Sequence, residues 1–230
     1  MKVKHYSVFE VLTTNVINWN GLRNEELESP YFLPNTREKY LSKVQAEQPS
    51  DYVLKMIEQM KKLGYKRILS LGCGIAQTEY HIKKESNLEV IVSDNTESIQ
   101  RLQSYGIFDE ALSLDILKDD YPADEETVVL MHRIDTEFND EDLKHIFKTC
   151  KTHGIRHVFF VPTNPFVFKI LLNEFKTLII SIIKRKKRTF CGYSRSKSSL
   201  IKLWRGSYEK IYEYRDEKSF YIIELTKKND

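Results

Sequence analysis

Short apolar runs of five to seven residues recur through the middle of the chain, and helical segments separate most of them. Runs of this length with little polar alternation are typical of strands that are buried on both faces of a parallel sheet. The pattern therefore predicts an α/β fold with a doubly wound, mostly parallel Rossmann-like sheet. The predicted strands are residues 67–71, 88–94, 110–115, 127–132 and 157–162.

Two helices are well marked at their ends. One is predicted over residues 51–63, because Ser50 is a suitable capping residue and Gly64 is a usual stop. Another is predicted over about 140–151, with Asn139 as its cap. Each lies between segments with different periodicity, as expected for helices that cover a sheet.

The carboxyl-terminal part is predicted to end in an antiparallel hairpin. Its strands are residues 208–215 and 219–225, and Asp216, Glu217 and Lys218 form the connection.

The chain divides into an amino-terminal cap segment and one main domain. Residues 1–48 are predicted to be partly helical and partly irregular, because Pro30 and Pro34 interrupt any long helix. The main domain covers residues 49–230 and contains a helical, basic insertion at 164–206.

The turn after the first predicted strand carries the most informative chemistry. Gly72 and Gly74 flank Cys73 there, and glycine lets the backbone turn tightly and a ligand approach closely. Backbone amides at the following helix start then face that ligand, as in nucleotide-binding folds. Asp94 ends the second strand 20 residues after Gly74, the spacing at which an acid binds a ribose diol.

With these features, residues 66–162 resemble the core of class I S-adenosylmethionine-dependent methyltransferases. The resemblance implies S-adenosylmethionine as the cofactor, with the glycine loop under its methionine part. It implies that Asp94 binds the ribose, that Asp115 binds the adenine amino group, and that the turn from Met131 faces the methyl acceptor. The implied cofactor-binding residues are Gly72, Cys73, Gly74, Asp94, Asn95, Asp115, Ile116 and Met131.

Three residues distinguish the alternatives. Ser70 stands where the methyltransferase family often has an acid, and Ala76 stands where a third small loop residue often follows. A nicotinamide-dependent dehydrogenase is the rival enzyme, but its fingerprint needs a small residue where this chain has Gln77. A non-catalytic cofactor-binding adaptor at a membrane or protein surface is the alternative from another class.

His132 is the candidate general base for methyl transfer, because it ends the fourth strand beside the expected acceptor. A packed histidine without a catalytic role is the competing interpretation. The acceptor is expected to be a small molecule or a glycan- or lipid-linked metabolite. The loop after His132 lacks the Asn/Asp-Pro-Pro-Tyr/Phe run of amino-directed nucleic-acid methyltransferases, which argues against nucleic acid.

Composition describes a globular protein with a formal net charge of +3, and three widely spaced cysteines give no metal or disulfide pattern. The amino end lacks the apolar run of a signal peptide, so a cytoplasmic location is expected. Residues 166–183 are strongly apolar, and the basic run Lys184–Arg188 follows. This predicts either a core helix with a solvated basic turn or peripheral contact with an anionic membrane through 166–188. A third interpretation is a basic groove for a phosphorylated or nucleic-acid substrate.

Overall fold

The computed structural model describes residues 2–5, 19–24, 31–163, 176, 179, 183, 192–215 and 221–228. Within this part of the chain, seven strands form one mixed sheet and two more form a small antiparallel ribbon. The order across the large sheet is β4-β3-β2-β5-β6-β9-β8. These strands are β2 (Arg67–Leu71), β3 (Glu89–Asp94), β4 (Glu110–Ser113), β5 (Thr127–His132), β6 (His157–Val161), β8 (Tyr208–Arg215) and β9 (Tyr221–Lys227).

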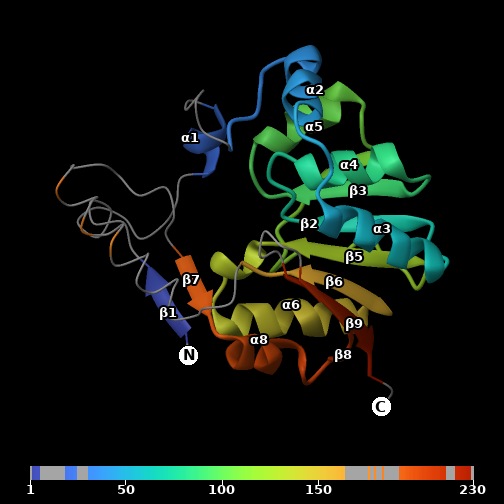
Figure 1. Cartoon of the computed structure of the whole chain (residues 1–230), viewed down its shortest axis with the longest axis vertical. Helices are drawn as coiled ribbons and strands as arrows, with labels where there is room; N and C mark the ends of the chain where they lie inside the picture. The colour runs from blue at the N-terminus through green and yellow to red at the C-terminus, as the bar shows by residue number, and fades with distance from the viewer. Residues whose placement is uncertain are drawn as a thin grey trace.

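Five consecutive strands of this sheet are parallel, and β2 lies at their centre between β3 and β5. Strand β9 runs antiparallel to β6, and β8 runs antiparallel to β9. The predicted mostly parallel sheet with an antiparallel carboxyl-terminal hairpin is therefore confirmed (Figure 1). The second hairpin strand begins at Tyr221, and the predicted connection at 216–218 lies outside the described residues.

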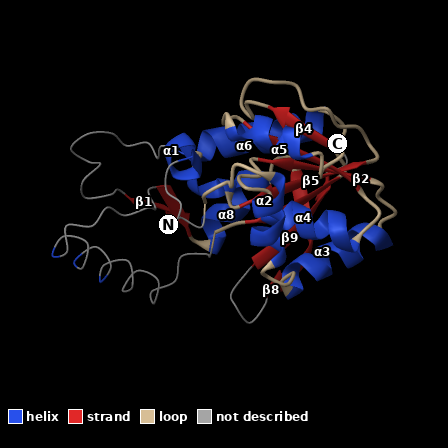
Figure 2. Ribbon diagram, turned by 90° about the horizontal axis from the view of Figure 1, so that it is seen from above, coloured by secondary structure: helices blue, strands red, loops and turns tan. Residues whose placement is uncertain are grey.

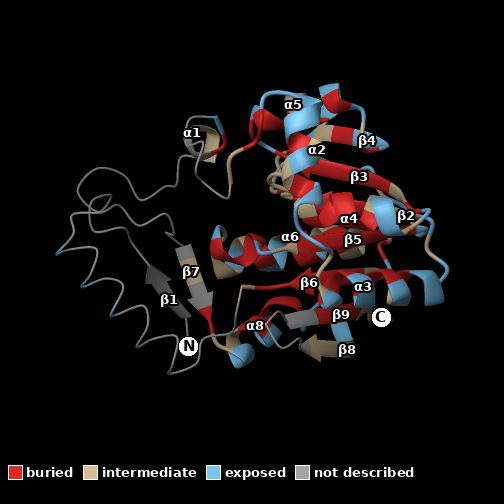
Figure 3. Cartoon of the chain, turned by 45° about the horizontal axis from the view of Figure 1, so that its top comes forward, coloured by how far each residue is buried: buried red, intermediate tan, exposed pale blue. Residues whose placement is uncertain are grey.

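Helices cover both faces of the sheet and bury its apolar side chains (Figures 2 and 3). Successive residues of β2 point to opposite faces, so Ile68 packs toward one helical layer and Leu69 toward the other. The first layer contains α2 (Arg37–Gln45), α3 (Asp51–Lys62), α4 (Gln77–Glu85) and α5 (Ser98–Tyr105), and the second contains α6 (Asp140–Thr152) and α8 (Lys197–Trp204).

The cap segment contributes two elements at the left of Figure 1. Strand β1 (Lys2–His5) pairs antiparallel with β7 (Gly192–Arg195), and helix α1 (Trp19–Asn24) lies apart from that ribbon. Tyr40 and Val44 of α2 belong to the same core cluster as α3, so this part of the cap segment packs on the main domain. The domain boundary near residue 48 stays a prediction.

Most of the predicted helix 166–183 lies outside the described residues. Lys176, Ile179 and Ile183 are helical, and all three are exposed. No helix in the described ranges has the length and apolar character that crossing a membrane requires.

Candidate functional site

The loop between β2 and α4 has left-handed backbone at three positions. Gly72, Gly74 and Ala76 have φ angles of +69°, +65° and +54°. The Cys73 N–H donates to the carbonyl of Ser93 on β3 at 2.8 Å, and the Ala76 N–H donates to the Cys73 carbonyl at 2.9 Å. These bonds hold the loop as a tight turn over the carboxyl ends of β2 and β3.

Gly72 is also crowded. A Cβ atom there would lie 2.9 Å from Ile134 Cγ2 and 3.6 Å from Ile116 Cδ1. Ile134 belongs to the short helix η1 (Ile134–Thr136) after β5. The loop therefore meets the turns that follow β4 and β5.

Asp94 is buried at the end of β3, and its carboxylate is bound from three sides. Oδ2 accepts the Gly74 N–H at 3.0 Å, and Oδ1 accepts the Thr96 N–H at 3.0 Å. Oδ1 also accepts a hydrogen bond from Arg23 Nη1 at 2.9 Å, which makes a buried ion pair. Asp94, which is predicted to bind the ribose, thus lies beside the loop, and a side chain of the cap segment is bound to it.

Helix α1 places Arg23 there. The guanidinium also donates to the hydroxyls of Thr96 and Ser98. The backbone carbonyl of Arg23 accepts the Leu33 N–H at 3.0 Å. Trp19 Nε1, at the start of α1, donates to Glu137 at 3.1 Å. Sequence reasoning missed Arg23, because it lies 71 residues before Asp94 and belongs to no motif.

A second buried acid lies beside the loop. Glu79, in the first turn of α4, accepts a hydrogen bond from the hydroxyl of Ser70 at 2.5 Å. Burial, together with the nearby Asp94 charge, raises the pKa of the Glu79 carboxyl to about 7. Burial, with the charges of Asp94 and Glu79, raises the pKa of the Cys73 thiol well above its usual value, so the loop cysteine is a neutral thiol.

The other implied cofactor residues are spread around this loop. Ile116 and Met131 are buried, and Asn95 is exposed beside Asp94. Asp115 is partly exposed, and its carboxylate accepts the Leu117 N–H at 3.0 Å and the Lys118 ammonium at 2.7 Å. The structure thus brings Gly72, Gly74 and Asp94 together, while Asp115 caps its own turn.

His132 lies between two helices of one layer. Its Nδ1 is 3.3 Å from the Thr78 hydroxyl on α4, and its Nε2 is 3.4 Å from the Tyr52 hydroxyl on α3. Burial, with the neighbouring Arg133 charge, lowers the pKa of His132 to about 3. The imidazole is therefore neutral, and both ring nitrogens face hydroxyl groups.

The turn after β5 is fixed from the ribbon side. Arg195 of β7 is fully buried and donates to Asp140 Oδ1 at 2.9 Å and to the carbonyls of Asp135 and Phe138. The Asp135 carboxylate accepts the Thr163 N–H at 2.9 Å, and burial raises its pKa to about 6. The expected acceptor turn is thus rigidly held, and sequence reasoning did not identify Arg195.

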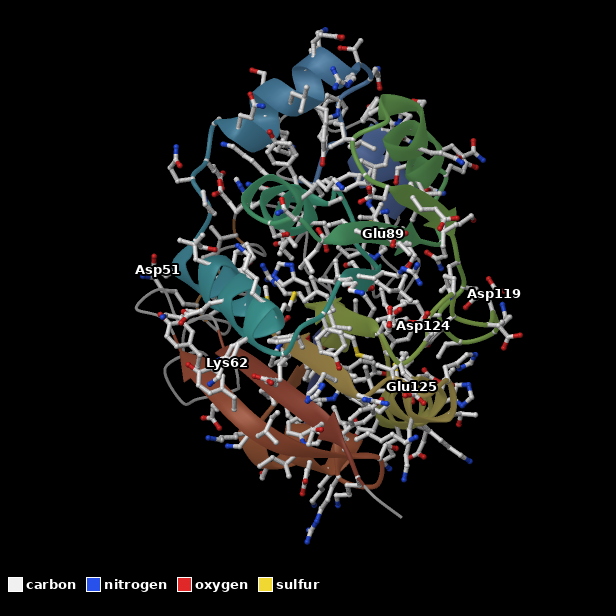
Figure 4. All side chains as sticks on the ribbon, turned by 90° about the vertical axis from the view of Figure 1, so that its right-hand side faces the viewer. Asp51, Lys62, Glu89, Asp119, Asp124 and Glu125 are labelled. Atoms are coloured by element: carbon white, nitrogen blue, oxygen red, sulfur yellow. The ribbon has the colours of Figure 1, made fainter. Side chains whose placement is uncertain are left out.

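Several acidic side chains lie at another edge of the molecule, away from the loop. Figure 4 shows Glu89, Asp119, Asp124 and Glu125 on the same side. Arg67 pairs with Glu89 and Asp124 there, and Arg156 pairs with Glu125. In the described part of the chain no group of histidine, cysteine and acid side chains has the arrangement of a metal site.

Comparison with known proteins gives structural matches only. No family model matches the sequence, and no curated protein matches it. The pyocyanin biosynthetic protein PhzM aligns with a TM-score of 0.64 at 13% identity, over 96% of this chain and 64% of PhzM. OxaC, solved with SAH and oxaline, aligns at 0.59 and 15% identity, over 84% of this chain and 52% of OxaC. Human N-acetylserotonin methyltransferase, solved with SAM, aligns at 0.57 and 12% identity, over 96% of this chain and 69% of that protein.

These likenesses show that the fold is that of class I S-adenosylmethionine-dependent methyltransferases, as residues 66–162 predicted. The chain spans between about half and two thirds of these three proteins.

Proposed function

We propose that this protein binds S-adenosylmethionine and transfers its methyl group to a small-molecule or to a glycan- or lipid-linked acceptor. The observation that carries the proposal is the assembly of the Gly72–Gly74 loop and the Asp94 carboxylate at the carboxyl edge of β2 and β3. A carboxylate there suits a ribose diol, because it accepts two charge-assisted hydrogen bonds. The methyltransferase neighbours, one of them solved with oxaline, support the same reaction and a small acceptor.

Different residues would bind the cofactor and position the acceptor. S-adenosylmethionine would supply an already activated methyl group. The glycine loop would lie under its methionine part and Asp94 would hold its ribose, with Ile116 and Met131 as apolar contacts, and Asp115 and Asn95 as polar ones. The turn fixed by Arg195 would hold the acceptor in line with the methyl group and exclude water.

His132 remains the candidate base of this proposal. A base acts best when its pKa is near the working pH, and the pKa of about 3 works against this role in the unliganded protein. A His132→Gln variant that loses activity at all pH values between 6 and 9, with cofactor binding unchanged, supports the role. An unchanged rate makes His132 a packing residue.

Calorimetry with S-adenosylmethionine, S-adenosylhomocysteine and NAD tests the proposal directly. Asp94→Ala should lose about 2–3 kcal/mol of S-adenosylhomocysteine binding, the scale of hydrogen bonds to a charged group. Glu97→Ala, an exposed acid in the same loop, is the matched control. Binding of NAD but of neither S-adenosyl compound would support the alternative that the protein is a dehydrogenase. Binding of S-adenosylmethionine without methyl transfer to any acceptor would support a non-catalytic adaptor.

We also propose a cytoplasmic location with peripheral contact to anionic membranes through residues 166–188. Ile179 and Ile183 are 42% and 74% exposed, and residues four apart on a helix share a face. The adjacent run Lys184–Arg188 contributes five positive charges, each worth about 1 kcal/mol near an anionic surface.

A sedimentation assay checks this contact. The protein should pellet with anionic vesicles at low salt and stay in solution with neutral ones. Salt at 1 M should release it, because the Debye length falls to about 3 Å. Glutamines in place of Lys184–Arg188 should also release it, because they remove the positive charges. No pelleting with anionic vesicles at low salt would discard the contact.

A further inference from the structure

The Ser70–Glu79 pair lies directly beneath the candidate cofactor loop. Ser70 is on β2 two residues before Gly72, and Glu79 is on α4 five residues after Gly74. Both are almost fully buried, at 0% and 1% exposure, and they share a 2.5 Å hydrogen bond. The loop therefore rests on a carboxyl group that the following helix brings back toward the strand.

No cation in the described part of the chain forms an ion pair with Glu79, whereas Asp94 is paired with Arg23. The groups that face Glu79 are the Ser70 hydroxyl on β2, the Cys73 thiol in the loop, the Asp94 carboxylate on β3, and the phenols of Tyr40 on α2 and Tyr52 on α3. None is positive. A buried carboxylate without a counter-charge costs several kcal/mol, and such groups concentrate at functional sites.

We propose that Glu79 is the anion that binds the ammonium group of the methionine part of S-adenosylmethionine, with the Ser70 hydroxyl orienting its carboxylate. This inference rests on the proposed function, because it needs that ligand in the loop. Glu79 is the buried acid beside the loop that has no ion-pair partner among the described residues, whereas Asp94 already has one. Helix α4 thus supplies the acid that the serine at position 70 on the strand does not.

The proposal predicts that cofactor binding releases a proton. In the unliganded protein the pKa of Glu79 is about 7, so the carboxyl is partly protonated at neutral pH. A nearby ammonium favours the ionised form and lowers that pKa. Affinity is then at its maximum above about pH 7 and falls as the pH drops below it, because binding must first remove the proton.

The test is calorimetry at pH 6 and pH 8 with two probes. S-adenosylhomocysteine carries the ammonium, and methylthioadenosine lacks it. Wild-type protein should bind S-adenosylhomocysteine roughly tenfold more weakly at pH 6 than at pH 8. Glu79→Gln should bind it roughly tenfold or more weakly at pH 8, lose the pH dependence, and bind methylthioadenosine as wild type does.

Two further variants complete the design. Glu85→Gln makes the same charge change at an exposed position of α4 and should behave as wild type. Ser70→Asp/Glu79→Gln returns a carboxylate from the strand side and should recover S-adenosylhomocysteine affinity. Recovery separates a charge requirement from a packing defect, and matching circular dichroism spectra confirm that each variant is folded.

Different results would overturn the role of Glu79 and the proposed function. Equal S-adenosylhomocysteine binding and equal pH dependence in wild type and Glu79→Gln overturn the role of Glu79 and leave the proposed function intact. A parallel loss of methylthioadenosine binding in Glu79→Gln also overturns it, because the defect then reaches the nucleoside. Wild-type protein that binds neither probe overturns the proposed function together with this inference.

Discussion

Two buried acids beside one loop are stabilised in different ways, and the difference originates in their partners. Asp94 has two backbone amides and a guanidinium, whereas Glu79 has the Ser70 hydroxyl and its own backbone amide, with no ion-pair partner among the described residues. The ionised form of Glu79 therefore lowers the free energy of unfolding. Such destabilising groups are common in binding sites.

This cost should appear in the pH dependence of stability. The folded pKa of Glu79 is about 7, above its ordinary value of 4.5, so wild-type stability should fall as the pH rises from 5 to 8. At ~1.4 kcal/mol per pKa unit the contribution is up to about 3 kcal/mol. In urea unfolding, the free energy of unfolding of Glu79→Gln relative to wild type should increase from pH 5 to pH 8. The control Glu85→Gln should show no such increase. Parallel pH profiles would contradict this.

The residues that sequence reasoning found and missed differ in how far apart their partners lie. Asp94 was predictable, because a fixed spacing from Gly74 places an acid at the end of the next strand. Glu79 was not identified, since its role depends on a helix turning back onto Ser70. Arg23 and Arg195 act across 71 and 55 residues, to Asp94 and Asp140, and no local pattern encodes such contacts.

At the scale of elements, the turn between β2 and α4 combines backbone strain with close packing. Gly72 has a φ of +69° and a Cβ there would lie 2.9 Å from Ile134. Gly106, at the end of α5, has a similar φ of +60° but open space around it. The two glycines therefore separate the effect of conformation from the effect of contact.

Gly72→Ala should be clearly more destabilising than Gly106→Ala. Both lose about 1–2 kcal/mol to the left-handed backbone, and only Gly72→Ala must also push Ile134 aside, which adds about 1–3 kcal/mol. Thermal unfolding of the two variants measures the difference, and cofactor affinity should fall in Gly72→Ala alone. Equal melting temperatures would mean that the loop yields to the added methyl group.

The central strands β2, β3, β5 and β6 were predictable because each is largely an apolar run. Strands β2 and β5 have the predicted bounds, and β3 and β6 differ by one residue. The β1–β7 ribbon was not predicted. Its sequences, Lys2–His5 and Gly192–Arg195, are short and polar, and they pair only because the fold brings them together.

At the scale of the whole molecule, segments from both ends of the sequence gather at the carboxyl edge of the sheet. Arg23 from the cap segment binds Asp94 after β3, and Arg195 from the β1–β7 ribbon binds the turn after β5. Trp19 of α1 reaches that same turn through Glu137. The candidate site is therefore closed by chain that lies outside its sequence motif.

This closure predicts that Arg23 and the ribose compete for Asp94. A diol needs acceptor positions on the Asp94 carboxylate, and Arg23 Nη1 lies 2.9 Å from Oδ1. Arg23→Gln should therefore bind S-adenosylhomocysteine roughly tenfold or more tightly and associate faster, since a hydrogen bond to a charged group of about 1.5–3 kcal/mol no longer has to be broken. Stopped-flow fluorescence can follow the binding, because Trp19 lies beside Arg23.

Arg37→Gln is the matched control. It makes the same charge change on α2, where Arg37 bonds only the Tyr105 carbonyl among the described contacts. Slower association and weaker binding in Arg23→Gln would instead make Arg23 part of the surface that holds the cofactor.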